Sequence, residues 1–265
     1  MNGYKLSIDI GGTFIDVVVF DFATRTLTAF KLSTTPQDPA KGVVDAIGRL
    51  DVAAGEIIEF IHGTTLGLNA VLERKLARTG LITTQGFRDV LELGRRTRPQ
   101  AYGMSGRFTP VIPRDLRLEV PERMDARGRV LTPLDEAAFR AALEGLLAAG
   151  CEALVIHFLH AYANPAHELR ALQIAAEAWP NAHVTAGHQL LSESREYERG
   201  VTAAVNAAVQ PLLERYIARL RDELSAFALD EVRAYDAVID EGPAHSGMSA
   251  VIDVVARRRP GPGPG

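Results

Sequence analysis

Two adjacent glycines between two apolar, strand-forming runs constrain the fold of this chain more than any other feature. The run from Tyr4 to Ile10 leads into Gly11-Gly12-Thr13, and the run Val17-Val18-Val19-Phe20 follows soon after. Glycines in this position predict a tight turn in which backbone N–H groups gather without Cβ atoms in the way. A concave group of amides binds anions, and phosphate above all. The pattern predicts a nucleotide phosphate loop, with an ordinary Gly-Gly hairpin turn as the alternative, because turn chemistry alone also accounts for the glycines.

Acidic residues flank the turn on both sides. Asp9 precedes it and Asp16 follows it, and two carboxylates repel a bare phosphate unless a divalent cation lies between them. We therefore expect Mg²⁺ at Asp9, held directly or through water. The amides of Gly11, Gly12 and Thr13 would stabilise charge on the phosphoryl group, which makes Asp9 and Thr13 the candidate catalytic residues. Asp16 remains open between a nucleotide-site residue and a turn or cap residue.

The order of the expected elements is that of an α/β protein. Residues 4–33 alternate apolar and polar residues in three runs, which predicts a β-β-β meander. After Pro39, helical and strand patterns alternate along the chain. Residues 153–159 are apolar nearly throughout, as in a central parallel strand buried on both faces. From Glu196 to about Phe227 we expect a long helix, or a helix pair broken by Pro211.

The last part of the chain has a different composition. Arginines and then alternating proline and glycine close the sequence, and such residues cannot form a core. GC-rich DNA read out of frame yields the same composition. We therefore expect one domain over residues 1–229 and a disordered or out-of-frame tail over residues 230–265.

Composition and charge exclude several classes of protein. A formal net charge of −4 argues against a generally basic surface for nucleic acid. Cys151 is the single cysteine, so an internal disulfide framework and a zinc site of cysteine type are excluded, which fits a reducing compartment. No secretory leader pattern opens the chain, and no apolar run is long enough to span a membrane. We expect a soluble, cytoplasmic protein that binds neither nucleic acid nor membrane.

A second candidate site lies where an expected strand ends and a helix begins. The run His62-Gly63-Thr64-Thr65 occupies this junction, and Asn69 follows one helical turn later. Ligands of α/β sheets bind at such junctions, where N–H groups and hydroxyls can hold a carboxylate or phosphate. The alternative is a capped helix start with a structural histidine.

Two pairs of basic residues are weaker candidates. Arg195 and Arg199 share a helix face at the i, i+4 spacing, and they bind either phosphate or substrate or belong to a solvated ion-pair face. His157 and His160 are three residues apart on an expected strand, so they point to opposite faces and cannot hold a metal together.

Six blocks of sequence resemble the N-terminal part of the hydantoinase A / 5-oxoprolinase family. In chain order, the blocks are Asp9 to Asp16; His62 to Thr65 with Asn69-Ala70 and Glu73-Arg74; Gly86 to Glu92; Val120 to Arg123; Phe158 to Glu168; and Arg195 to Arg199. The resemblance implies an actin-like, ribonuclease H-like ATPase lobe that binds ATP and Mg²⁺. Two departures stand out: Ile15 replaces the usual threonine, and the second phosphate loop and adenosine-binding region of the family have no match here.

The resemblance also implies a reaction. Members related to N-methylhydantoinase and 5-oxoprolinase hydrolyse a cyclic amide with ATP, together with a hydantoinase B-like partner subunit. The ATP-using acetone and acetophenone carboxylase subunits have the same phosphate loop and act on a ketone. The alternatives are therefore an ATP-dependent cyclic amide hydrolase, as a truncated chain or one part of a larger enzyme; an ATP-dependent carboxylase subunit; or a non-catalytic fragment. Because one lobe supplies only part of the contacts, we expect the chain alone to bind ATP weakly or not measurably.

Overall fold

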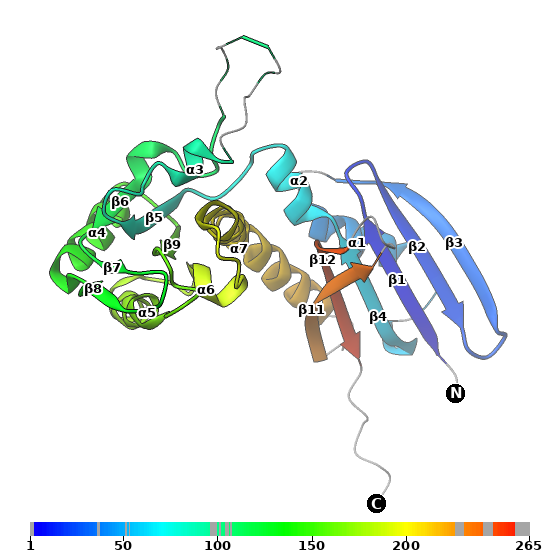
Figure 1. Cartoon of the computed structure of the whole chain (residues 1–265). Coiled ribbons are helices and arrows are strands. Elements are labelled where there is room, and N and C mark those ends of the chain that lie inside the picture. The colour runs from blue at the N-terminus through cyan, green and yellow to red at the C-terminus, as the bar shows by residue number, and fades with distance from the viewer. Residues whose placement is uncertain are drawn as a thin grey trace, which may run out of the picture. The chain divides into compact units, whose positions relative to one another are not determined.

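The chain forms two compact units joined through one long helix (Figure 1). The computed structural model describes residues 3–35, 38–50, 52, 54–95, 100, 102–103, 106, 108–225, 231–240 and 246–257. Unit 1 comprises residues 1–75 and 212–265, and unit 2 comprises residues 76–211. The sequence predicted one domain over residues 1–229, whereas the structure divides that range into two cores.

Unit 1 opens with the predicted meander. Strand β1 (Tyr4–Ile10) pairs antiparallel with β2 (Phe14–Asp21), and β2 pairs antiparallel with β3 (Thr26–Ser33). The turn between β1 and β2 contains Gly11, Gly12 and Thr13, so this prediction is confirmed.

The sheet of unit 1 has six strands in the order β11-β12-β4-β1-β2-β3. Strand β4 (Ile57–Thr64) lies parallel to β1. Helix α1 (Pro39–Gly48) and the second half of α7 (Glu196–Ser225) pack on one sheet face. The core between them is apolar and consists mainly of Leu6, Ile8, Ile15, Val17, Val43, Ile47, Phe60, Leu220 and Leu224. Helix α2 (Leu66–Leu72) follows β4 directly, and a 3-10 turn (Ala54–Glu56) precedes it.

The structure has two strands near the C-terminus, where we expected disorder. Strand β11 (Glu231–Asp240) pairs antiparallel with β12 (Ser246–Arg257), and β12 pairs antiparallel with β4. The expectation is wrong for these two ranges, because both runs contain the β-branched residues typical of strands and β4 offers an edge for pairing. Residues 241–245 and 258–265 lie outside the described residues.

Unit 2 contains a parallel sheet of four strands in the order β10-β9-β5-β6. The strands are β5 (Thr79–Thr84), β6 (Arg117–Val120), β9 (Ala153–His157) and β10 (Val184–Ala186). All residues of β5 and β9 are buried, which confirms the prediction of a central strand covered on both faces. A short hairpin of β7 (Arg123–Met124) and β8 (Val130–Thr132) turns at Gly128.

Helices cover both faces of this parallel sheet. They are α3 (Val90–Leu93), α4 (Glu136–Ala148), α5 (Ala166–Ala178), α6 (Gly187–Leu190) and the first half of α7, with a 3-10 turn at Arg114–Leu116. A Cβ atom on Gly80 of β5 would clash with Leu146 of α4, whereas one on Gly200 of α7 would clash with His157 of β9. Since side chains alternate along strands, α4 and α7 lie on opposite faces.

Helix α7 continues through Pro211, so the structure has the single long helix rather than the helix pair that was the alternative. The N–H of Ala77 donates to the carbonyl of Ala208 at 3.0 Å, which adds a hydrogen bond beside the position where proline removes one. Within the described part of the chain, none of the helices combines the length and the apolar character that crossing a membrane requires.

Candidate functional site

The glycine turn lies at the carboxyl ends of two parallel strands of unit 1. Ile10, the last residue of β1, is in register with Thr64, the last residue of β4. The N–H of Thr65 donates to the carbonyl of Ile10 at 3.4 Å, and the N–H of Thr34 donates to that of Thr13 at 3.0 Å. These bonds tie the turn to the start of α2 and to the end of β3. This is the edge at which α/β sheets bind ligands.

The glycines of this turn are not required by backbone conformation. Neither Gly11 nor Gly12 has a φ angle in the left-handed region, which a two-residue Gly-Gly hairpin would demand. The N–H of Gly11 donates to the carbonyl of Phe14 at 3.0 Å, and no described backbone carbonyl accepts from the N–H of Gly12 or Thr13. Both of these residues are exposed. The glycines therefore keep space open beside amides, which favours the anion site over the ordinary turn.

A cavity of about 250 Å³ opens beside the turn. Its lining comes from β1, the turn, the starts of α1 and α2, and the segment after α2: Ile10, Gly11, Gly12, Thr34, Pro39, Thr64, Leu66, Asn69, Ala70, Glu73 and Lys75, with Leu212 of α7. A Cβ atom on Gly12 would lie 3.7 Å from Nδ2 of Asn69, so the amide of Asn69 faces the glycine at close range.

Asp9 and Asp16 lie opposite each other on β1 and β2, on the sheet face away from the core. Asp16 forms an exposed ion pair with Lys31 at 3.1 Å. Among the described residues, no group of three or more acidic, histidine or cysteine side chains converges on a metal position. Mg²⁺ at phosphates needs only one or two carboxylates, because phosphate oxygens and water complete its coordination. The pair Asp9 and Asp16 fits that requirement.

His62 is a structural histidine, which was the alternative interpretation of this junction. Its imidazole is completely buried and stacks on Phe60. Nδ1 is 2.9 Å from the carbonyl oxygen of Ile8, and Nε2 contacts the hydroxyl of Tyr216. A carbonyl only accepts, so Nδ1 carries the proton and Nε2 accepts from the tyrosine. Burial lowers the pKa of His62 to about 4, and this side chain does not line the cavity.

Thr64 and Thr65 lie at the site, but the hydroxyl oxygen of each already accepts a hydrogen bond from a nearby residue of the same segment. Oγ1 of Thr64 accepts from the N–H of Leu66 at 3.2 Å, and Oγ1 of Thr65 accepts from Nδ2 of Asn69 at 3.2 Å. Gly63 is in register with Asp9 on the neighbouring strand. The junction therefore contributes Thr64 and Asn69 to the cavity rather than a row of free helix amides.

Ile15, where the resembling family has threonine, is part of the core. Its side chain is 1% exposed, and a Cβ on Gly42 of α1 would lie 2.6 Å from its Cδ1 atom. The side chain thus packs over a glycine of α1 instead of facing the turn.

Arg195 and Arg199 belong to unit 2 and differ in burial. Arg195 precedes the first residue of α7 and is exposed, and it forms an ion pair of 3.7 Å with Glu198. Arg199 is fully buried and donates to the carbonyl of Glu193 at 2.6 Å and to that of Phe158 at 3.3 Å. Desolvation lowers the pKa of Arg199. The N–H of Arg199 donates to the carbonyl of Arg195 at 3.3 Å, so Arg195 lies at the N-terminal boundary of α7, but of the two side chains only that of Arg199 is buried.

The carboxyl edge of the unit 2 sheet is filled by buried polar groups. Glu168 is completely buried and accepts from the N–H groups of Phe158 and His188 at 2.8 and 2.9 Å and from Nδ1 of His188 at 2.6 Å. Glu122 accepts from Nδ1 of His167 at 2.8 Å and from the hydroxyl of Thr84. These carboxylates hold the loops after β5 and β9 in place.

His157 ends β9 and is enclosed by two glycines. A Cβ on Gly187 would lie 2.8 Å from its Nδ1, and one on Gly200 would lie 2.9 Å from its Cδ2. Burial lowers the pKa of His157 to about 4. His160 lies beyond the strand with φ of 57°, so the expected alternation of two strand histidines does not apply.

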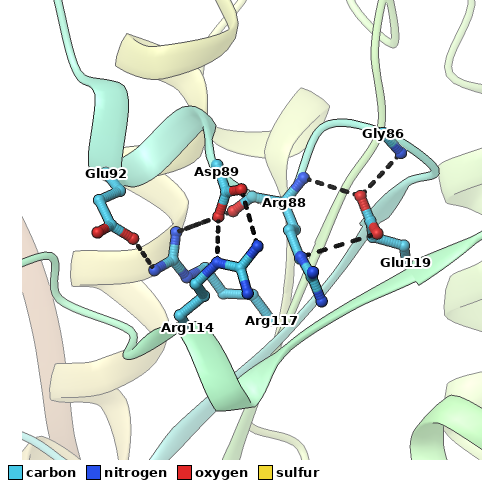
Figure 2. A network of polar contacts seen from close by, with 7 residues as sticks. All are labelled: Gly86, Arg88, Asp89, Glu92, Arg114, Arg117 and Glu119. Carbon is cyan, nitrogen blue, oxygen red and sulfur yellow. Dashed lines mark hydrogen bonds and ion pairs between the residues drawn. The ribbon is translucent and has the colours of Figure 1, made fainter.

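The block Gly86 to Glu92 is held by residues of β6 and the preceding 3-10 turn (Figure 2). Glu119 accepts from the N–H groups of Gly86 at 2.7 Å and Arg88 at 3.2 Å. Arg114 donates twice to Asp89, at 2.9 and 3.1 Å, and lowers the pKa of that carboxyl group.

The buried guanidinium of this network is Arg117. It donates to the carbonyl of Arg88 at 2.9 Å and to Glu92 at 2.7 Å (Figure 2). The contacts shown in Figure 2 join three arginines to three carboxylates, so the charges balance within the network.

Sequence reasoning missed Lys75, Glu122 and Glu168. Glu122 and Glu168 lie inside blocks that resemble the family, and Lys75 directly follows such a block. Their position in or beside these blocks was the only sign of a role, because no chemical pattern in the sequence marks them.

Burial raises the pKa of the Cys151 thiol, which agrees with packing rather than reactivity.

Comparison with known proteins identifies the family. The model of the hydantoinase/oxoprolinase N-terminal region matches residues 5–179, more than half of the chain. The chain belongs to this family. Its α/β fold matches a nucleotide-free structure of acetone carboxylase with a TM-score of 0.72 and 25% identity, over 90% of this chain and 36% of that one.

Two curated relatives show the range of the family. The alpha subunit of caprolactamase from Pseudomonas jessenii is 34% identical over 82% of this chain and 33% of its own length. The gamma subunit of acetophenone carboxylase from Aromatoleum aromaticum is 33% identical over 84% of this chain and 33% of its own length. This family chain therefore spans about a third of the length of these relatives.

Proposed function

We propose that this chain supplies the phosphate-binding part of an ATP site in an enzyme that hydrolyses a cyclic amide of hydantoin or 5-oxoproline type. Unit 1 would serve as one lobe of an actin-like ATPase, and a hydantoinase B-like subunit would be the partner. The observation that carries the proposal is the Gly11-Gly12-Thr13 turn, which has glycine without conformational need and exposed amides beside a cavity.

The residues of the turn have separate tasks in this proposal. The amides of Gly12 and Thr13 bind and orient the terminal phosphates, and Gly11 holds the turn through its bond to Phe14. Asp9 and Asp16 hold Mg²⁺ on the outer sheet face. ATP, when bound, would supply the phosphoryl group that converts an unreactive amide oxygen into a leaving group.

A cyclic amide is favoured because caprolactamase, a relative at 34% identity, is named for a cyclic amide. An ATP-dependent carboxylase acting on a ketone is the second candidate, since acetophenone carboxylase is 33% identical and acetone carboxylase matches the fold. ADP formation by an enzyme that contains this chain, measured with 5-oxoproline, hydantoin, and acetone plus bicarbonate, separates the two reactions.

The phosphate site itself is tested by ³¹P NMR of ATP titrated with the chain, with and without Mg²⁺. We expect broadening and shifts of the phosphate signals that depend on Mg²⁺, and we expect Asp9→Asn to remove that dependence. Asp45→Asn is the matched control, an exposed aspartate on α1 in the same unit. ATP signals that stay unchanged at millimolar concentration, or a Mg²⁺ dependence that survives in Asp9→Asn, would contradict the proposal.

A further inference from the structure

We propose that Lys75 and Asn69 bind phosphate in the cavity beside Gly12, and that Glu73 competes with the phosphate for Lys75. This inference rests on the proposed function, because it assigns further ligands to the same phosphate. It adds a lysine and a competing carboxylate to a site in which backbone amides and Mg²⁺ otherwise hold the phosphates.

The size and lining of the cavity suit part of a ligand. Its volume of about 250 Å³ lies just below the range of about 300 to 1,000 Å³ for pockets that enclose a whole small molecule. Of the described residues that line it, Lys75 is the cation and Glu73 the anion. A small cavity with a single lysine is suited to a phosphate tail rather than to a complete nucleotide.

The backbone turns sharply to bring Lys75 to the cavity. Helix α2 ends at Leu72, and Arg74 takes a left-handed conformation with φ of 54°. The N–H of Lys75 then donates to the carbonyl of Ala70 at 2.9 Å, and the N–H of Arg74 donates to that of Val71 at 3.2 Å. This is a helix-ending motif that normally uses glycine at the left-handed position. The turn folds Lys75 back beside the last turn of α2.

The ion pair of Lys75 is one that a ligand can replace. Nζ of Lys75 is 2.6 Å from Oε2 of Glu73, and the two side chains are 77% and 56% exposed. Exposed pairs of this kind contribute little to stability, whereas phosphate carries more charge than one carboxylate. Exchange of Glu73 for phosphate therefore costs little and increases the charge that faces Lys75.

Asn69 connects this lysine to the glycine turn. Its Nδ2 donates to Oγ1 of Thr65 at 3.2 Å and has a second hydrogen. The same nitrogen would lie 3.7 Å from a Cβ on Gly12. The amide of Asn69 is thus placed to donate to an anion held at the N–H of Gly12.

A double-mutant cycle tests the competition. The dissociation constant for Mg·ATP is measured from amide shifts of the ¹⁵N-labelled chain in the wild type, Lys75→Gln, Glu73→Gln and the double variant. We expect Lys75→Gln to weaken binding about tenfold, as for one charge-assisted hydrogen bond. Glu73→Gln should tighten it about threefold by freeing Lys75. In the double variant the gain from Glu73→Gln should disappear.

Lys5 and Glu59 provide the matched control. They form an ion pair of 2.7 Å at the other end of the same sheet, about 20 Å along β1 from the turn. Lys5→Gln and Glu59→Gln should leave the dissociation constant unchanged. Lys75→Arg, which keeps the charge, should retain most of the affinity.

The outcomes distinguish this inference from the function on which it rests. Equal gains from Glu73→Gln with and without Lys75 would show a general charge effect and overturn the inference. Loss of binding in Asp9→Asn together with normal binding in Lys75→Gln would reject the lysine and keep the ATP site. Absence of Mg·ATP binding by the wild type would reject both.

Discussion

The two units differ in what lies at the carboxyl ends of their parallel strands: a cavity in unit 1 and buried polar side chains in unit 2. In unit 1, β1 and β4 end at glycines and threonines beside a cavity, with the amides of Gly12 and Thr13 exposed. In unit 2, the ends of β5 and β9 are packed with Glu122, Glu168 and Arg199, all buried. In both units two parallel strands end at this edge, but the residues at the edge decide whether it is a ligand crevice or a structural polar core.

The same contrast concerns glycine. A Cβ on Gly12 would meet only Nδ2 of Asn69, at 3.7 Å, whereas Gly187 and Gly200 enclose the ring of His157. A glycine at a sheet edge therefore either leaves room for a ligand or allows close packing of a neighbouring side chain. The distance from an added Cβ atom to its neighbours distinguishes the two cases.

The largest expected effect is in the polar core of unit 2. Glu168→Leu leaves the N–H groups of Phe158 and His188 without their acceptor and removes a buried charge beside Arg199. We expect a loss of about 3 to 5 kcal/mol in the free energy of unfolding, measured by urea denaturation. The control is Glu177→Gln on the same helix, an exposed residue paired with Arg140, which should change nothing measurable. Equal stability of the Glu168→Leu variant and the wild type would show that this edge is not a structural core.

Acid should destabilise both units through one buried histidine each. Burial lowers the pKa of His62 and of His157 from 6.5 to about 4. Between these values the unfolded chain binds more protons than the folded chain, so stability rises with pH and is lost as the pH falls from 6.5 toward 4. Each histidine should lower stability by about 2 kcal/mol between about pH 7 and about pH 5.

Urea denaturation at the two pH values measures this loss. In His62→Gln the loss should be smaller, because the only remaining histidine of the pair is His157. A stability that is unchanged or higher at the lower pH would contradict the assignment of both imidazoles as neutral.

Matched glycine substitutions sharpen the comparison further. Gly187→Ala places a methyl group 2.8 Å from Nδ1 of a buried imidazole, and we expect a loss of about 1 to 3 kcal/mol in stability. Gly12→Ala meets nothing closer than 3.7 Å and involves no left-handed φ, so its stability should remain that of the wild type. Its affinity for Mg·ATP should nevertheless fall, since the methyl group occupies the cavity. Thermal unfolding of both variants in parallel checks the order of the two effects.

Much of the fold was predictable because local patterns agreed with tertiary packing. Alternation around the glycine turn predicted β1, β2 and β3, and the continuous apolar run at Ala153 predicted a central parallel strand. The strands β11 and β12 were missed because the proline-glycine end dominated the composition of that region. Helix α7 continues through Pro211, and Ala77 donates a hydrogen bond to Ala208 beside it, a contact between distant residues that no local pattern reveals.

The site was predictable only in part. Asp9 and the glycine turn follow from residue type and order. The burial of His62 depends on Tyr216, which is 154 residues away in sequence, and the cavity position of Lys75 depends on the left-handed Arg74. Neither feature can be predicted from the spacing of residues along the chain.

The contrast between an open edge in unit 1 and a filled edge in unit 2 is tested most directly by amide NMR. The ¹⁵N-labelled chain is titrated with Mg·ATP to millimolar concentration, and the shifts of Gly11, Gly12 and Thr13 are compared with those of Gly187 and Gly200. We expect saturable shifts at the turn of unit 1 and none at the two glycines of unit 2. Shifts concentrated at Gly187 and Gly200, with an unperturbed turn, would contradict the assignment of the nucleotide site to unit 1.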